Sequence, residues 1–102
     1  MNRKTKYPQI RVYWQSLAGK EWFTNISFNG NEDLLEWFRE HRNPYGNLSR
    51  SLISIIQDRL GADIEGLTLR GETSMLAKEQ GMSMQKLIIR WMREEMEGKN
   101  AK

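Results

Sequence analysis

The chain has 102 residues, a formal net charge of +3 and a sequence pI near 9.4, so it is long enough for one domain and only mildly basic. It contains no cysteine, which excludes disulfides and cysteine-based zinc sites and favours a reducing, cytoplasmic compartment. No apolar run approaches the length of a membrane span or of a signal peptide's hydrophobic region, so no membrane association is expected.

The N-terminal segment is basic. Five cations precede Glu21, the first acidic residue, namely Arg3, Lys4, Lys6, Arg11 and Lys20. A basic arm of this kind can neutralise phosphates or enter a DNA minor groove. A solvated, frayed terminus is an equally good interpretation of the same residues. Arg3, Lys4 and Lys6 are therefore candidate auxiliary DNA contacts.

Two alternating segments, 10–15 and 22–28, predict a β-hairpin with a turn around Gly19. One face carries the apolar set Ile10, Val12, Trp14, Trp22, Ile26 and Phe28. Trp14, Trp22 and Phe28 are expected in the core. Tyr13 and Phe23 fall on the opposite face, where aromatic side chains beside basic residues can stack on unpaired bases.

Two helices are predicted after the hairpin. The first begins at Glu32 and ends before Pro44, with acidic residues in its first turn. The second runs from about Leu48 to Leu60 and is stopped by Gly61. Glutamates at 32, 36 and 40 share one face, but without a neighbouring histidine or carboxylate cluster they predict a solvated face rather than a metal site.

The last third of the chain predicts a strand, a helix, a tight turn and a long helix. The segment 67–70 alternates, Gly81 can close a helix, and Ser83 is a good N-cap for a helix from Met84. The predicted order is β-β-α-α-β-α-α, an α+β fold. A single domain over 1–102 is expected, with a possible division into a 1–61 hairpin-and-helix platform and a 62–97 strand-helix-helix module.

The long helix is apolar over most of its girth. Met84, Leu87, Ile88 and Trp91 form one stripe, and Ile89, Met92 and Met96 form a second beside it. An arc this wide predicts burial in a subunit interface in so small a chain, and hence a homodimer. The expected interface residues are Leu67, Leu69, Leu87, Ile88, Trp91 and Met92.

The segment 76–83, LAKEQGMS, followed by Leu87-Ile88 and Trp91-Met92, resembles the second half of a ribbon-helix-helix protein of the Arc/MetJ type. The resemblance covers about a third of the chain, and Leu67–Arg70 corresponds to the ribbon. It implies a homodimer on double-stranded DNA, with Thr68 and Arg70 turned toward base edges. It also implies that Ser83, at a helix N-terminus, meets a backbone phosphate. Gln85 and Lys86 follow on the same helix and are further DNA-contact candidates.

A helix-turn-helix module is a rival interpretation, with Ala77, Gly81 and Leu87 at suitable offsets and Ser83 to Arg90 as recognition helix. Arg90 is then a further DNA-contact candidate. Against it, Met84, Ile88 and Ile89 would fall near the groove-facing side. A plain helical hairpin that completes a globular core, with no nucleic acid, is the third interpretation.

No glycine-rich phosphate loop, nucleophile elbow or metal-binding motif occurs, so no catalytic residue, cofactor or metal is expected. The sequence predicts a non-enzymatic DNA-binding regulator acting as a homodimer, of the repressor, antitoxin, plasmid or phage type. The alternative is an inhibitor or adaptor that binds a protein partner through the aromatic hairpin and the methionine-rich helix.

Overall fold

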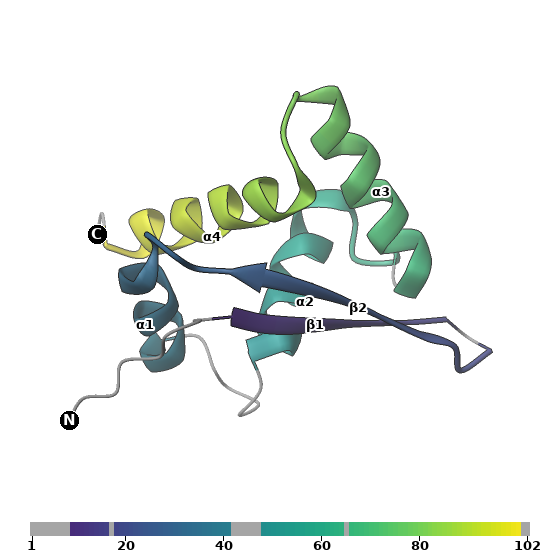
Figure 1. Ribbon diagram of the computed structural model, residues 1–102, viewed down its shortest axis with the longest axis horizontal. Helices are drawn as coiled ribbons and strands as arrows, with labels where there is room; N and C mark the ends of the chain where they lie inside the picture. The colour runs from purple at the N-terminus through teal and green to yellow at the C-terminus, as the bar shows by residue number, and fades with distance from the viewer. Residues whose placement is uncertain (1–8, 17, 42–47, 65, 101–102) are drawn as a thin grey trace.

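The computed structural model describes residues 9–16, 18–41, 48–64 and 66–100. Over these residues the fold is α+β, as predicted, with an antiparallel hairpin followed by four helices (Figure 1). The strands are β1 (Gln9–Gln15) and β2 (Glu21–Ser27). The helices are α1 (Glu32–His41), α2 (Leu48–Leu60), α3 (Gly66–Glu79) and α4 (Met84–Asn100).

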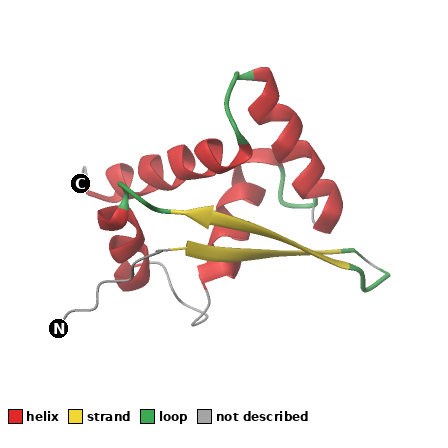
Figure 2. Cartoon of the chain, in the orientation of Figure 1, coloured by secondary structure: helices red, strands yellow, loops and turns green. Residues whose placement is uncertain are grey.

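The hairpin forms because apolar and polar residues alternate along both strands, and this alternation divides it into two faces. Val12 pairs with Thr24, and Tyr13 pairs with Phe23. The inner face, directed toward the helices, consists of Ile10, Val12, Trp14, Trp22, Thr24 and Ile26. The outer face consists of Arg11, Tyr13, Phe23 and Asn25. The turn end of the hairpin extends past the helices (Figure 2).

The strand predicted at Leu67–Arg70 is wrong, because these residues are the first turns of α3. The order of elements is therefore β-β-α-α-α-α, and the last three elements are all helices. Leu69, Thr73 and Ala77, four residues apart, are the buried residues of α3. This helical repeat outweighs the alternation of Leu67 and Leu69, which is too short to distinguish a strand from a helix.

Gly66 begins α3 in the left-handed region, with φ of 71°. A β-carbon at this position would collide with the main-chain carbonyl oxygen of Gln15, at the end of β1. Glycine therefore allows the start of α3 to lie directly on the backbone of the hairpin.

The turn between α3 and α4 follows the predicted capping. Gly81 has φ of 72°, and the amide of Met82 donates to the carbonyl of Ala77 at 3.0 Å. This is the hydrogen-bond pattern of a left-handed helix cap. Ser83 then caps α4, since its hydroxyl accepts from the amide of Lys86 at 3.2 Å. Gly81 and Ser83 therefore end α3 and begin α4 as the sequence predicted.

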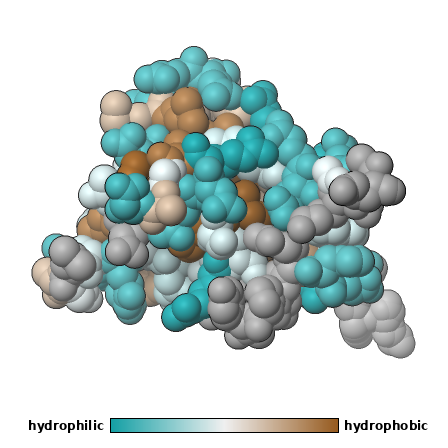
Figure 3. All heavy atoms as spheres, turned by 180° about the vertical axis from the view of Figure 1, so that it is seen from behind, coloured by the Kyte–Doolittle hydropathy of each residue, from teal (hydrophilic) through white to brown (hydrophobic). Residues whose placement is uncertain are grey.

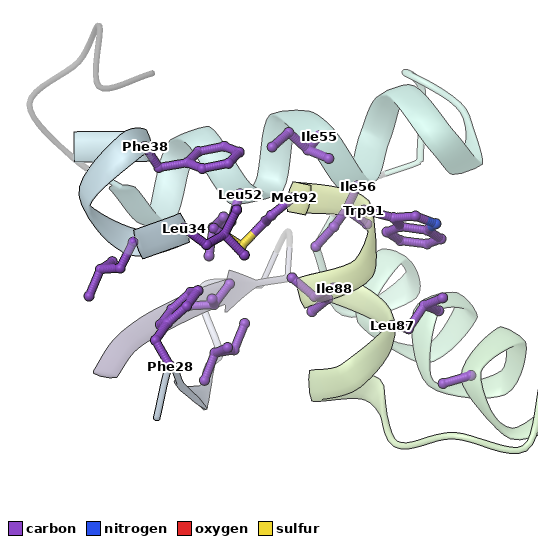
Figure 4. Close-up of a cluster of buried hydrophobic side chains, with 14 of the residues drawn as sticks. Phe28, Leu34, Phe38, Leu52, Ile55, Ile56, Leu87, Ile88, Trp91 and Met92 are labelled. Atoms are coloured by element: carbon purple, nitrogen blue, oxygen red, sulfur yellow. The ribbon is translucent and has the colours of Figure 1, made fainter. Parts of the chain in front are cut away.

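The core is built around α4, which contacts α1, α2 and α3. Each of these helices covers part of its wide apolar arc. Met92 and Ile88 are directed toward side chains of the neighbouring elements, among them Leu34 and Leu52 (Figure 4). Side chains from all six elements enter this one buried cluster. The arc that predicted a subunit interface is used inside a single chain.

Candidate nucleic-acid interface

Exposed aromatic side chains gather on the hairpin. Among the described residues, the large hydrophobic side chains that remain exposed are Tyr13, Trp22, Phe23 and Met75, of which only Met75 lies outside the hairpin. Tyr13 and Phe23 are 47% and 48% exposed and pack edge to face, with ring centroids 5.0 Å apart. The sequence placed these two rings on the outer face, and the structure confirms that placement.

Each exposed ring group has an arginine beside it. The Arg11 guanidinium lies over the Phe23 ring, 5.3 Å from its centroid, and its Nε donates to Asn25 Oδ1 at 3.4 Å. On the other face, the Arg70 guanidinium lies 5.9 Å from the Trp22 centroid. Its Nε donates to Thr24 Oγ1 at 3.3 Å. Rings on both faces of the hairpin thus have an arginine beside them, Arg11 from β1 and Arg70 from α3.

Trp22 differs from the expectation that it lies in the core. It occupies the inner face opposite Trp14, but it is 45% exposed, whereas Trp14 is buried. The Nε1 of Trp14 donates to Thr24 Oγ1 at 2.9 Å, which holds that ring against the body. Trp22 lies one residue from the turn end of β2, and Arg70 of α3 covers part of its ring. The prediction that Trp22 lies on the inner face is confirmed, but the prediction that its ring is buried in the core is wrong.

Thr68 and Arg70 were predicted to point outward from a ribbon, and they lie instead on α3. Thr68 is exposed in the first turn, on the rim of a groove that also includes Tyr13 and Trp14. Arg70 is half-buried and reaches the hairpin through Thr24. The structure therefore brings both residues to the hairpin, although not as strand residues.

The predicted contacts on α4 lie at its start, next to the end of β2. The Oε1 of Gln85 accepts from the amide of Ser27 at 3.0 Å, so this side chain joins helix to strand. Lys86 and Arg90 are exposed, and Arg90 donates to Gln80 Oε1 at 2.9 Å. Ser83 uses its hydroxyl as the helix cap. Lys86 and Arg90 are the cations of this group that face solvent.

A groove of about 620 Å³ runs between α4 and the loop after β2. Its lining includes Ile89, Lys86, Arg90 and Arg93. Arg93 donates to Asn31 Oδ1 at 2.9 Å and to Asp33. The hydrogen bond from Arg93 is the main reason why the pKa of the Asp33 carboxyl lies below its ordinary value. Arg93 therefore has a structural role, tying the loop to α4.

Five of the six residues predicted for a dimer interface are buried within the chain itself. Leu69, Leu87, Ile88, Trp91 and Met92 are each at most 5% exposed. Leu67 is partly buried and packs against the core cluster. Figure 3 shows hydrophobic surface on the rear side only in small separate areas. These residues cannot serve as the contact surface for a second copy while the fold is intact.

Arg3, Lys4 and Lys6 lie outside the described residues, so the structure gives no account of them. In the described part of the chain, no group of three or more histidine or acidic residues is arranged to hold a metal ion. None of the described helices is both long and apolar enough to span a membrane. Comparisons with protein-family models, with curated proteins and with solved structures found no match.

Proposed function

We propose that this chain binds nucleic acid through its hairpin, and that bases of an unpaired strand stack on the exposed rings. The observation that carries the proposal is the set of rings and cations described above. Tyr13, Phe23 and Trp22 are each about half exposed, and Arg11 and Arg70 lie within 6 Å of two of these rings. Exposed aromatic side chains beside arginine are the means by which single-strand binders hold successive bases.

The distribution of charge along the chain favours a nucleic-acid partner. Residues 1–20, which include β1 and the turn, carry five cations and no acidic residue. The remaining 82 residues carry eleven cations and thirteen acidic residues. The small net charge of the whole chain therefore hides a basic N-terminal segment on an otherwise slightly acidic protein. Of its five cations, Arg11 and Lys20 belong to the described hairpin, and the other three lie outside the described residues. A phosphate backbone is attracted to such a segment.

The exposed rings favour an unpaired strand over a duplex. In a duplex, the faces of the bases are stacked on one another and only their edges are accessible in the grooves. A side chain that offers a flat ring gains most where a base can be splayed out. The alternative is that the protein binds a duplex, either with the hairpin in a major groove or with Lys86 and Arg90 of α4. This alternative corresponds to the homodimeric DNA-binding regulator expected from the sequence.

A protein partner is the second candidate. Tyr, Trp, Phe and Arg are enriched in protein interfaces, and all four occur on the hairpin. The charge asymmetry distinguishes the two candidates, because a protein interface of rings does not require five cations in the first 20 residues. A steep dependence of affinity on salt supports nucleic acid, and a shallow one supports a protein partner.

The test is fluorescence anisotropy with a labelled single-stranded oligonucleotide and its duplex, each as DNA and RNA, at two salt concentrations. Wild-type protein should prefer the single strand. The double variant Tyr13→Thr/Phe23→Thr keeps β propensity, and loss of two stacked bases at roughly 1–3 kcal/mol each should weaken binding at least tenfold. Arg11→Gln should reduce the salt slope by about one.

Met75→Thr is the matched control, because Met75 is an exposed hydrophobic residue on α3, outside the hairpin. It should bind as wild type. Equal affinity of the double variant and wild type would overturn the assignment of the surface. A preference for duplex that is lost in Lys86→Ala/Arg90→Ala would move the site to α4. No binding to any probe at low salt would leave the protein-partner candidate.

A further inference from the structure

One edge of the hairpin is largely unpaired by the residues that the structure describes. In an antiparallel ladder, alternate residues direct their amides toward the paired strand and away from it. The amide of Tyr13 donates outward to Ser49 Oγ at 3.1 Å, which places the odd-numbered residues of β1 on its outer edge. The amide of Ser27 likewise donates outward, to Gln85. Phe23 and Asn25 share this phase, so their amides also point away from β1.

Helices α2 and α3 lie against β1, whereas on the outer edge of β2 a helix residue bonds only the amide of Ser27 among the described residues. α2 and α3 both contact β1, and Ser49 of α2 satisfies its outer amide at Tyr13. On β2, Gln85 satisfies Ser27. The amides of Phe23 and Asn25 donate to no other described residue. With respect to the described residues, the backbone of residues 21–25 is therefore an open edge, and open edges pair readily with another strand.

We propose that a second copy of this chain pairs with the open edge through its own residues 21–25. Two identical edges can pair antiparallel about a two-fold axis. The open segment is centred on Phe23, and pairing Phe23 with the partner's Phe23 makes the two segments overlap completely. If the two-fold axis lay closer to Ser27, the partner strand would have to pair with the amide of Ser27, which already donates to Gln85.

The charges along the edge agree with this register. Glu21 lies at one end of the segment, and Asn25 lies at the other with Arg11 Nε bonded to its side chain. Antiparallel pairing sets Glu21, whose carboxylate accepts from Gln15 Nε2 at 2.9 Å, opposite the partner's Asn25. The partner's Arg11 then lies one strand beyond that asparagine, and the two-fold axis repeats the arrangement. An axis on Glu21 would place two carboxylates directly opposite one another, which is destabilising.

The pairing would extend the proposed nucleic-acid surface. Residues 21, 23 and 25 of both copies fall on one face, because residues in register across a sheet share a face. The result is a four-stranded sheet in the order β1-β2-β2-β1, with Arg11, Tyr13 and Phe23 present twice. This consequence rests on the proposed function, whereas the pairing itself does not. A strand that spans both copies gains affinity because its second contact is intramolecular.

Asn25→Pro is the direct test. Proline lacks the outward amide that a partner strand needs, while the ladder between β1 and β2 loses no donor. Asn25→Thr is the matched control, because it keeps the amide. Sedimentation velocity over a wide range of protein concentration should show dimers for wild type and Asn25→Thr and monomers for Asn25→Pro. Circular dichroism checks that both variants are folded.

Cysteine crosslinking tests the register, since the chain has no cysteine of its own. Phe23→Cys should crosslink rapidly with a short bismaleimide, because the two positions face each other. Tyr13→Cys lies one strand further out in each copy, about 14 Å apart over three strand spacings, and should crosslink poorly. Equal rates at the two positions, or dimers that persist in Asn25→Pro, would overturn the pairing, as would a wild type that stays monomeric at every concentration.

The two proposals fail in different ways. If the pairing is wrong and the function right, Asn25→Pro and Asn25→Thr should bind a single-stranded oligonucleotide equally, with the same salt slope. If the function is wrong and the pairing right, sedimentation still distinguishes the two variants although neither binds an oligonucleotide. If both are right, Asn25→Pro should bind a long oligonucleotide several-fold more weakly than Asn25→Thr and a short one with equal affinity.

Discussion

The two faces of the hairpin are made by the same two strands and have opposite environments. On the inner face, Val12, Trp14 and Ile26 are at most 1% exposed. On the outer face, Tyr13 and Phe23 are nearly half exposed although they sit in the ladder directly beside buried residues. Burial accounts for the aromatic and aliphatic residues of the inner face except Trp22, which is 45% exposed near the turn. It does not account for those of the outer face, and this difference is the reason for placing recognition there.

The largest loss of stability is expected when an aromatic residue of the inner face is replaced, and a replacement on the outer face provides the comparison. Trp14→Ala removes a buried ring and its hydrogen bond to Thr24, and should cost about 3–5 kcal/mol in free energy of unfolding. Phe23→Thr should cost no more than about 1.5 kcal/mol, the contribution of an aromatic pair. Urea denaturation at equal protein concentration measures both. Similar losses at the two positions would break the comparison.

A second substitution tests the contact between the start of α3 and the backbone of β1. Gly66→Ala adds a β-carbon that meets the carbonyl of Gln15 and requires a left-handed backbone of a non-glycine residue. We expect a loss of about 1–3 kcal/mol in free energy of unfolding, because either α3 or β1 must shift. Gly81→Ala is the control, since it also has positive φ but no neighbouring atom within 4 Å. Equal losses would mean that the close approach to Gln15 contributes nothing.

The smallest loss of stability is expected from removing the ion pair between Arg93 and Asp33, which lies beyond the end of the hairpin opposite the turn. Asp33 has a pKa below its ordinary value of 3.8, so its contribution to stability is present above that pH and is lost as the pH falls through the lower, folded-state value. Its side chain is 67% exposed, so Asp33→Asn should cost only a few tenths of a kcal/mol at neutral pH.

The difference between wild type and Asp33→Asn should disappear at a pH well below 3.8, where the carboxyl is protonated in both the folded and the unfolded chain. Urea midpoints at the two pH values measure it. Glu32→Gln, in the same first turn of α1, controls for the general effect of an acidic residue at a helix start. A difference that persists unchanged in acid would contradict the role assigned to Arg93.

The elements with agreeing local signals were predictable from sequence. The hairpin alternates over both strands, α1 has acidic residues at its start, and α4 begins at a serine after a glycine. The segment 67–70 failed because two leucines two residues apart fit a strand as well as a helix. The repeat of Leu69, Thr73 and Ala77 was the signal for the helix, and it continues across Gly71.

The candidate site was predictable only in part, because sequence shows which face a side chain occupies but not what covers it. Tyr13 and Phe23 were placed correctly by alternation alone. The wide apolar arc of α4 predicted a second subunit, whereas α1, α2 and α3 supply the cover. Arg70 could not be assigned to the hairpin, because its contact with Thr24 joins positions 46 residues apart.

The two hydrogen bonds from outward amides of the hairpin to the helices have a consequence for the order of folding. The turns of the hairpin and of the α3–α4 pair join neighbouring residues, so each unit can form early from local contacts. The bonds from Tyr13 to Ser49 and from Ser27 to Gln85 span 36 and 58 residues. Those amides can be protected only after the helices have docked on the hairpin. Pulsed hydrogen exchange at Tyr13 and Ser27 would therefore time the docking step separately from the formation of the hairpin.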